Sequence, residues 1–197
     1  MSQILDNDKV GSFKILQKIG EGGMAVIYKA TQPSLKRDVV IKKLKDPNRE
    51  IIERFKKEAL VSASLSQENV LSIYDFIYYG RSYYLVMEYV DGKDLRTIID
   101  YAAPLKPPIA ALIIREVAKG LEYTHTKNII HRDIKPSNII IAYTGDVKLI
   151  DFGVAKDETL SKLTVTGMIV GTPSYMSPEQ ANGDRLGKES DIYSLGV

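Results

Sequence analysis

Residues 131–138 read HRDIKPSN, and a short distance further along the chain residues 151–153 read DFG. The first stretch places the carboxylate of Asp133, the ammonium group of Lys135 and the amide of Asn138 within six positions. The carboxylate can accept a proton from an attacking hydroxyl, and the ammonium group can neutralise phosphate charge. The amide and the second carboxylate, in DFG, offer the hard oxygen ligands that Mg²⁺ prefers. The spacing therefore indicates a site for a polyanion that is held by magnesium.

Either tripeptide, HRD or DFG, is on its own more typical of a solvated loop or a turn. Together, and with this spacing, the two motifs resemble those of the protein kinase family. The resemblance implies that Asp133 orients the substrate hydroxyl and accepts its proton, and that Lys135 steadies the transferring phosphate. It also implies that Asn138 and Asp151 hold Mg²⁺, and that ATP is the phosphate donor.

The bulk composition is that of an ordinary globular protein of one or two small domains. The chain has 197 residues and a formal net charge of only +2, so no basic field favours nucleic acid. It has no cysteine, which excludes disulfides and a cysteine nucleophile and fits a reducing compartment. No apolar run approaches the ~18 residues of a membrane span, and the first residues, MSQILDNDKV, lack a signal-peptide pattern. We therefore expect a cytoplasmic chain without a membrane segment, although the parent protein could carry an anchor outside it.

A glycine cluster, GEGGMAVI at residues 20–27, lies between two stretches that favour strands, 13–19 and 26–31. Glycines there allow backbone amides to approach phosphate oxygens closely. A plain hairpin turn is the simpler interpretation of this stretch alone, whereas a dinucleotide-binding fold is disfavoured because a strand follows where a helix is required. The stretch resembles the glycine-rich loop of kinases, with Ala25 in place of the third glycine. The resemblance implies nucleotide contacts for Ile19, Gly20, Glu21, Gly22, Gly23, Met24, Ala25 and Ile27.

The motif VVIK ends in Lys42, within a third expected strand at 37–44. A solvated strand lysine is the alternative, but the motif resembles the kinase strand whose lysine reaches the α- and β-phosphates, with Val40 in the adenine roof. Residues 48–65 favour a helix that carries Glu58. At about 100° per residue, Glu58 shares its face with Ile51, Phe55, Ser62 and Leu65. A carboxylate in such a stripe is costly unless it is paired, and the resemblance supplies Lys42 as its partner.

Two further strands are expected at 70–79 and 82–89. The end of the second, with the residues that follow it, reads MEYVDG at 87–92 and resembles the kinase hinge. The resemblance implies that adenine is bordered by Met87, held at its edge by the Glu88 carbonyl and the Val90 amide, and supported from below by Ile140.

From Asp151 to Glu179 the chain loses periodicity and is rich in Gly, Thr and Ser, which indicates a functional or disordered segment. Its end, GTPSYMSPE at residues 171–179, resembles the end of a kinase activation segment, with Ser177 in place of the usual alanine. Lys135 and the downstream Thr172 are typical of serine/threonine kinases rather than tyrosine kinases. The phrases GMA and SPEQ are most similar to those of bacterial eukaryotic-like Ser/Thr kinases.

Within the same segment, Thr164 and Thr166 resemble the paired regulatory threonines of bacterial kinases. The resemblance implies that they are phosphorylation sites, modified between molecules in a kinase–kinase dimer, and that Arg132 receives the phosphate. Solvated loop threonines with no such role are the alternative.

The resemblance as a whole implies an α+β fold with two lobes, a small antiparallel-sheet N-lobe at 13–89 and a mainly helical C-lobe at 90–197, after an N-terminal extension at 1–12. A long helix is expected from residue 107 to about residue 125. Residues 191–197, DIYSLGV, resemble the start of the buried central helix of the C-lobe, in which Asp191 anchors the catalytic-loop backbone. Because the family domain continues beyond that helix, we expect a C-terminally truncated, incomplete C-lobe.

These motifs together predict a serine/threonine protein kinase that transfers the γ-phosphoryl group of ATP, with Mg²⁺, to Ser or Thr hydroxyls of a protein substrate. The main alternative is a truncated, inactive kinase fragment that acts only as a nucleotide-binding or interaction module. A dinucleotide-dependent enzyme is a distant third possibility, because a strand follows the glycine cluster.

Overall fold

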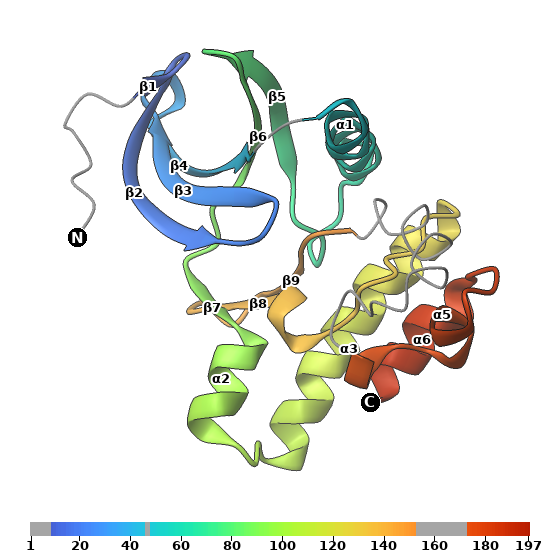
Figure 1. Ribbon diagram of the computed structural model, residues 1–197. Helices are drawn as coiled ribbons and strands as arrows, with labels where there is room; N and C mark the ends of the chain where they lie inside the picture. The colour runs from blue at the N-terminus through green and yellow to red at the C-terminus, as the bar shows by residue number, and fades with distance from the viewer. Residues whose placement is uncertain (1–8, 46–47, 153–172) are drawn as a thin grey trace. The chain divides into compact units, whose positions relative to one another are not determined.

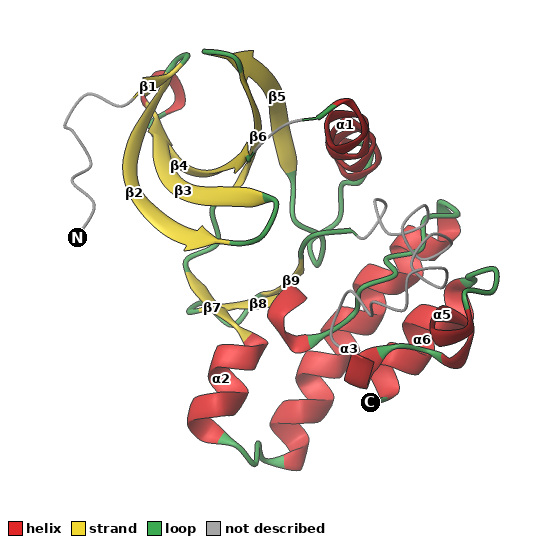
Figure 2. Ribbon diagram, viewed as in Figure 1, coloured by secondary structure: helices red, strands yellow, loops and turns green. Residues whose placement is uncertain are grey.

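The computed structural model describes residues 9–45, 48–152 and 173–197. Contacts divide the chain into two units. The first comprises the described residues up to Ala63 together with Ser72–Tyr89, and the second comprises Ser64–Leu71 and the described residues from Val90 to Val197. The first unit is built mainly from strands and the second mainly from helices (Figure 1, Figure 2). The predicted α+β fold is therefore confirmed.

The first unit contains an antiparallel six-stranded sheet in the order β1-β2-β3-β4-β6-β5. The strands are β1 (Lys9–Val10), β2 (Phe13–Glu21), β3 (Ala25–Gln32), β4 (Arg37–Leu44), β5 (Ile73–Tyr79) and β6 (Ser82–Glu88), and the short 3₁₀ helix η1 (Pro33–Leu35) precedes β4. β4 has the predicted bounds, and β2 and β3 extend slightly beyond theirs. The sequence analysis missed β1, which has only two residues and therefore no period to detect.

The sheet has one strongly buried face because side chains alternate along a strand. In β4, Val39 and Ile41 are fully buried in a core cluster that also contains Phe13 and Val86. Lys42 follows Ile41 and therefore points to the opposite face, where it is only partly buried. The alternation thus fixes which side of the sheet presents the ammonium group.

Helix α1 (Arg49–Ala63) follows Asn48, whose side-chain oxygen accepts the N–H of Ile51 at 2.9 Å in the manner of an N-cap. It packs against β5, and the rings of Phe55 and Phe76 lie 5.7 Å apart (Figure 1). The helix is two residues shorter at its C-terminal end than predicted. Leu65 is buried, but it lies beyond the helix in the second unit, so its assignment to the Glu58 stripe was wrong.

The predicted strand 70–79 was also wrong at its start, since β5 begins at Ile73. Val70 forms an isolated parallel bridge with Leu149, and the Leu71 N–H donates to the Leu149 carbonyl at 2.9 Å. Both contacts are made within the second unit. An apolar, β-branched run favours strand pairing, but it does not say which partner the backbone pairs with.

In the second unit a three-stranded antiparallel sheet has the order β7-β8-β9. Its strands are β7 (Gly92–Asp94), β8 (Ile139–Ala142) and β9 (Val147–Leu149), and its helices are α2 (Leu95–Ala102), α3 (Pro107–Thr126), α5 (Pro178–Asn182) and α6 (Lys188–Gly196). Two 3₁₀ helices, η2 (Pro136–Asn138) and η4 (Pro173–Tyr175), complete the described elements. The long helix α3 matches its prediction, and it starts on two prolines, as the first turn of a helix allows.

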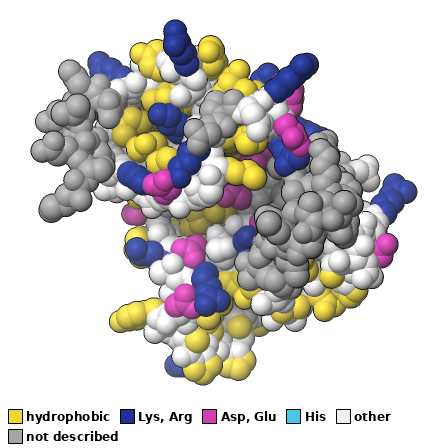
Figure 3. All heavy atoms as spheres, viewed as in Figure 1, with side chains coloured by type: hydrophobic (Ala, Val, Ile, Leu, Met, Phe, Trp, Pro, Cys, Tyr) yellow, Lys and Arg dark blue, Asp and Glu magenta, His cyan; other side chains and the backbone are white. Residues whose placement is uncertain are grey.

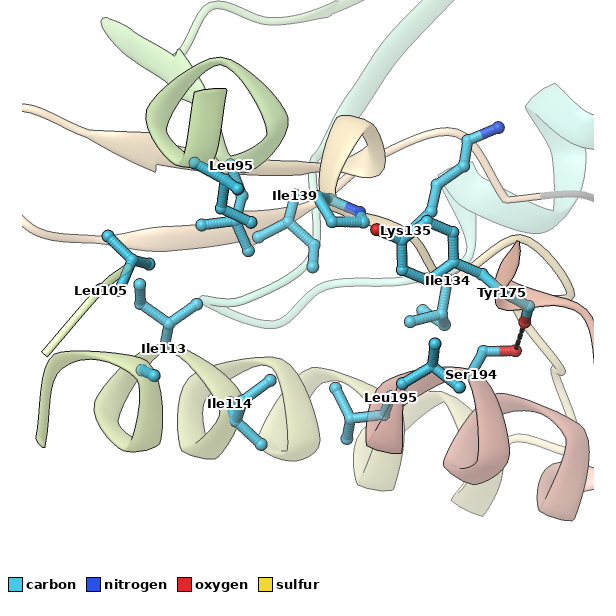
Figure 4. A pocket seen from close by; sticks show the side chains of 14 residues that line it. Leu95, Leu105, Ile113, Ile114, Ile134, Lys135, Ile139, Tyr175, Ser194 and Leu195 are labelled. Carbon is cyan, nitrogen blue, oxygen red and sulfur yellow. Dashed lines mark hydrogen bonds between the residues drawn. The ribbon is translucent and has the colours of Figure 1, made fainter. Parts of the chain in front are cut away.

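The core of the second unit gathers around α3, where Val117 and Leu121 are almost completely buried against Leu149 and Ile139. An apolar cavity of about 200 Å³ adjoins this core (Figure 4). Side chains from α2, α3 and α6 line it, among them Leu95, Ile113 and Leu195. The Lys135 stick extends away from these apolar groups (Figure 4), so its ammonium group lies outside the cavity.

The surface of the described residues carries charges of both signs. On the face shown in Figure 3, Lys and Arg side chains lie beside Asp and Glu side chains, which agrees with the small net charge of +2. Among the helices that the structure describes, none combines the length and apolarity that crossing a membrane requires.

Candidate active site

The HRDIKPSN stretch forms a loop between α3 and β8 that brings three of the predicted catalytic side chains together. The Asp133 Oδ2 atom lies 3.0 Å from the Lys135 Nζ atom and accepts a hydrogen bond from the Asn138 Nδ2 atom at 2.9 Å. Asn138 also donates to the Asp133 carbonyl at 2.8 Å. Proline at the start of η2 turns the chain tightly between Lys135 and Asn138. The result is a carboxylate flanked by a cation and an amide.

The backbone of this loop is held by Asp191 at the start of α6. Its carboxylate, which is 1% exposed, accepts the N–H groups of His131 and Arg132, each at 2.8 Å. The same carboxylate lies 2.8 Å from His125 Nε2. Arg132 has a φ of +66°, in the left-handed region that non-glycine residues seldom adopt. These hydrogen bonds stabilise a backbone conformation that the loop would not favour by itself.

His131 has no exposed surface, and its ring lies 4.6 Å from the ring of Phe152. The Nε2 atom lies 3.1 Å from the Ile150 carbonyl, to which it donates, and Nδ1 accepts the Asp133 N–H at 3.4 Å. Burial lowers the pKa of His131, which matches this neutral arrangement with one donor and one acceptor. His131 therefore links Ile150, the residue just before the DFG aspartate, to the catalytic loop.

The predicted metal ligands, Asn138 and Asp151, lie at the same end of a strand pair. Asn138 precedes β8 and Asp151 follows β9, the two strands are antiparallel, and the Ile150 N–H donates to the Asn138 carbonyl at 3.0 Å. Because the Asn138 amide nitrogen donates twice to Asp133, its oxygen is the atom oriented to act as an acceptor or ligand. The part of the chain that the structure describes holds no group of three or more His, Cys, Asp or Glu with metal-site geometry. The residues present fit a hard cation that takes its remaining ligands from a bound phosphate.

In the first unit, Lys42 on β4 and Glu58 on α1 form the expected ion pair. The Lys42 Nζ atom lies 3.1 Å from the Glu58 Oε1 atom, and the side chains are only 16% and 14% exposed. The pairing satisfies the carboxylate on the inner face of α1, as its position among apolar residues required. It also fixes the direction of the lysine, because a side chain held at its tip loses its rotational freedom.

The glycine-rich stretch forms the β2–β3 hairpin. A hairpin is expected both for a plain turn and for a kinase glycine-rich loop. The Gly22 N–H donates to the Ala25 carbonyl at 2.9 Å, and Lys45 Nζ donates to the Gly22 carbonyl at 3.1 Å. Hydrogen bonds from Lys18 and Lys45 lower the pKa of the exposed Glu21 carboxyl to about 2. Ile19 and Met24 are 45% and 56% exposed, so the turn presents apolar side chains as well as amides.

The remaining predicted nucleotide contacts lie in both units. Val40 on β4 and Met87 on β6 are cross-strand partners. The Glu88 N–H donates to the Ser72 carbonyl at 2.9 Å, and its carboxylate accepts the Ser72 N–H at 3.1 Å, so two hydrogen bonds tie the end of β6 to Ser72. Val90 and Ile140 belong to the second unit, with Ile140 opposite Asp94 in the β7–β8 pair. The predicted phosphorylation sites, Thr164 and Thr166, lie outside the described residues, as do Gly153 and Thr172.

Sequence reasoning missed two side chains that contact this machinery, His125 and Gln180. His125 meets Asp191, and the Gln180 Nε2 atom donates to the Arg132 carbonyl at 2.9 Å. Both partners lie far away in the sequence, so only the tertiary structure brings them together. The SPEQ phrase was the available signal for Gln180, although nothing in the pattern indicated what its side chain contacts.

Comparison with known proteins agrees with this geometry. Residues 13–197 match the family model described as the protein kinase domain, and the chain therefore belongs to the protein kinase family. It is 45% identical over 188 residues to a probable serine/threonine-protein kinase of Clostridium perfringens, covering 94% of this chain and 27% of that protein.

Two other relatives are described as serine/threonine-protein kinases. The serine/threonine-protein kinase PrkC of Bacillus subtilis is 42% identical over 190 residues, which is 95% of this chain and 29% of PrkC. The serine/threonine-protein kinase PknA of Mycobacterium tuberculosis is 38% identical over 197 residues, which is 95% of this chain and 45% of PknA. The chain thus spans less than half the length of these relatives.

Proposed function

We propose that this chain transfers the γ-phosphoryl group of ATP to Ser or Thr hydroxyls of a protein substrate. The observation that carries the proposal is the cluster of Asp133, Lys135 and Asn138, in which a carboxylate is held beside a cation within 3.0 Å. The names of the relatives, serine/threonine-protein kinases, support the same class of reaction.

In the proposed reaction the substrate hydroxyl oxygen attacks the γ-phosphorus, and the bond from that phosphorus to the oxygen it shares with the β-phosphate breaks. ADP leaves, and the hydroxyl proton passes to the Asp133 carboxylate. Lys135, whose Nζ atom lies 3.0 Å from that carboxylate, stabilises negative charge on the transferring group. Asn138 supports the reaction by fixing the orientation of Asp133 through two hydrogen bonds.

Mg²⁺, when bound, neutralises charge on the phosphates of ATP. The residues that would hold it are Asn138, through its side-chain oxygen, and Asp151. Lys42, held by Glu58, binds the α- and β-phosphates, and the remaining nucleotide contacts are those that the family resemblance assigns to the glycine-rich hairpin and the hinge. Since ATP and Mg²⁺ are abundant in the cytoplasm, we place the reaction there.

The experiment that tests the proposal uses ATP labelled on the γ-phosphate and a protein rich in exposed Ser, Thr and Tyr. We expect labelled phosphoserine and phosphothreonine, no phosphotyrosine, and loss of transfer when Mg²⁺ is chelated. Label that stays in ATP would reject the proposal and favour a nucleotide-binding module. Label released only as inorganic phosphate in the presence of substrate would also reject it, because the γ-phosphoryl group would then pass to water.

We further propose that Thr164 and Thr166 are phosphorylated by a second copy of the chain. A phosphothreonine brings about −1.5 to −2 charges and can accept paired hydrogen bonds from a guanidinium, and Arg132 directly precedes the proposed catalytic aspartate. Mass spectrometry of the chain after incubation with ATP should find phosphate on one or both residues, at a rate that rises with the square of protein concentration. Unchanged activity after replacement of both by Ala would argue against a regulatory role.

A further inference from the structure

The Gln180 side chain is buried and uses both ends of its amide. Its Oε1 atom accepts the Ser177 N–H at 3.0 Å, and its Nε2 atom donates to the Arg132 carbonyl at 2.9 Å. In return the Ser177 hydroxyl oxygen accepts the Gln180 N–H at 3.3 Å, which completes a capping box at the start of α5. Only 7% of Gln180 and none of Ser177 is exposed.

The capping box explains only half of these contacts. A box of this kind needs an acceptor at the third helical position, and Glu serves there as well as Gln. Glutamate, however, has no N–H to give to the Arg132 carbonyl at neutral pH. The bond from Nε2 therefore has a role that helix capping does not account for.

The Arg132 carbonyl belongs to the peptide group that joins Arg132 to Asp133. On its other edge, the Asp133 N–H of the same peptide group donates to His131 Nδ1 at 3.4 Å. One residue earlier, the Arg132 N–H is bound by Asp191 at 2.8 Å. The peptide plane immediately before Asp133 is thus held from both sides, at a residue whose φ of +66° is unfavourable without such support.

We propose that Gln180 is a positioning residue for Asp133: by holding the Arg132 carbonyl it fixes the peptide plane from which the Asp133 side chain projects. The kinetic consequence rests on the proposed kinase function, whereas the structural consequence does not. Through Gln180 the end of the activation segment and the catalytic loop form one hydrogen-bonded unit, so a change in the conformation of α5 reaches Asp133 directly.

The decisive variant is Gln180→Glu, which keeps the acceptor for Ser177 and replaces the donor to Arg132 with an oxygen. Ser177→Ala is the matched control, because it weakens the cap while leaving the Gln180–Arg132 bond in place. Gln180→Met, similar in length but without hydrogen bonds, serves where the carboxylate variant fails to fold.

The first measurement is hydrogen exchange of assigned amides in the intact chain, which needs no activity. We expect the Arg132 and Asp133 amides to exchange about tenfold faster or more in Gln180→Glu and Gln180→Met, as the loss of one hydrogen bond implies. Amides of α3 should keep their rates, and Ser177→Ala should change the Gln180 amide only. Equal rates at Arg132 in wild type and both Gln180 variants, or an equal increase in Ser177→Ala, would overturn the proposal.

The second measurement is the pH dependence of phosphoryl transfer. We expect the kcat of Gln180→Glu to fall about tenfold or more at neutral pH with little change in KM for ATP. The deficit relative to wild type should shrink as the pH falls, since a protonated carboxyl can again donate, whereas Gln180→Met should show a deficit that does not change with pH. A pH-independent deficit in Gln180→Glu would contradict the role of the donor. If the wild-type chain transfers no phosphate, the proposed function fails and the exchange rates still decide this inference.

Discussion

Asp133 is positioned by neighbours at two distances in the sequence. Lys135 and Asn138 hold its side chain from within the same loop, whereas Asp191 holds the backbone just before it from another helix. The local neighbours could be predicted from the spacing of the HRDIKPSN motif. The role of Asp191 followed only from the resemblance to kinases, since an aspartate at a helix start is ordinarily a capping residue.

The Lys42–Glu58 pair gives a prediction about coupling. Lys42→Met and Glu58→Gln should each lower phosphoryl transfer, by up to roughly 10²-fold, because misplaced phosphates react slowly. The double variant should be hardly worse than Lys42→Met, since both changes remove the same interaction. Measured kcat/KM values in a double-mutant cycle check this. Lys43→Met is the matched control, because Lys43 lies on the same strand and its Nζ atom rests 5.9 Å from the ring of Tyr84. Fully additive losses would show that the pair is not coupled.

Burial of His131 gives the folded chain a pH dependence of known sign. Its pKa is lowered in the folded state, while the unfolded chain titrates near the ordinary 6.5. Below about pH 6.5 the unfolded state binds a proton at this histidine that the folded state does not bind. The stabilising contribution of His131 is therefore fully present above that pH and declines as the pH falls below it. The exposed Glu21 carboxyl, with its pKa lowered to about 2 from 4.5, acts with the same sign, and its contribution is lost only as the pH falls below about 4.5.

Urea unfolding between about pH 5 and pH 8, together with NMR of the imidazole nitrogens, measures this dependence. We expect His131 to remain neutral, with its proton on Nε2, at pH values where a free histidine is charged. An imidazole that titrates near 6.5 in the folded chain would contradict its burial.

Among the elements, the long and strongly patterned ones were predicted, whereas several short ones, such as β1 and α2, were not. β4 and α3 have clear periods of two and 3.6 residues over many positions. The eight-residue helix α2 was missed, although its sequence contains a signal for a helix start. That signal is Asp94, which caps the helix by accepting the Thr97 N–H. The start of β5 was misplaced because Val70 pairs in the second unit. Pairing partners depend on tertiary contacts that a linear pattern does not contain.

The close contact of α3 with β9 leaves little room for a side chain at Gly120. Alanine normally stabilises a helix interior relative to glycine by about 1 kcal/mol. At this position an added Cβ would lie 2.9 Å from the Cδ1 atom of the fully buried Leu149 and 3.2 Å from the Asn69 carbonyl oxygen. We therefore expect Gly120→Ala to destabilise the chain by roughly 1–3 kcal/mol, as overpacking does.

Gly196 in α6 provides the matched control, since an added Cβ there meets nothing within 4 Å. Gly196→Ala should be neutral or slightly stabilising. Chemical denaturation of both variants makes the comparison. A Gly120→Ala chain as stable as wild type would show that α3 can move away from β9 at little cost.

At the scale of the molecule, each unit holds its own part of the proposed machinery. The first carries the Lys42–Glu58 pair and the glycine-rich hairpin, and the second carries Asp133, Asn138 and Asp151. The sequence alone was sufficient to predict these residues as candidate site residues, because kinase motifs are short and contiguous. The sequence did not identify His125 or Gln180 as site residues. Their contacts with Asp191 and Arg132 form only when α3, α5 and α6 have assembled around the catalytic loop.

The measurement that tests the central claim most directly is the kinetics of Asp133→Asn. We expect kcat for transfer to a Ser/Thr substrate to fall by roughly 10²–10⁴-fold, since the proton acceptor is lost, while the Kd for ATP stays close to that of wild type. Asp146→Asn, at the exposed β8–β9 turn, should leave both values unchanged. Near-normal turnover in Asp133→Asn, or equal losses in the two variants, would contradict the assignment of Asp133 as the catalytic carboxylate.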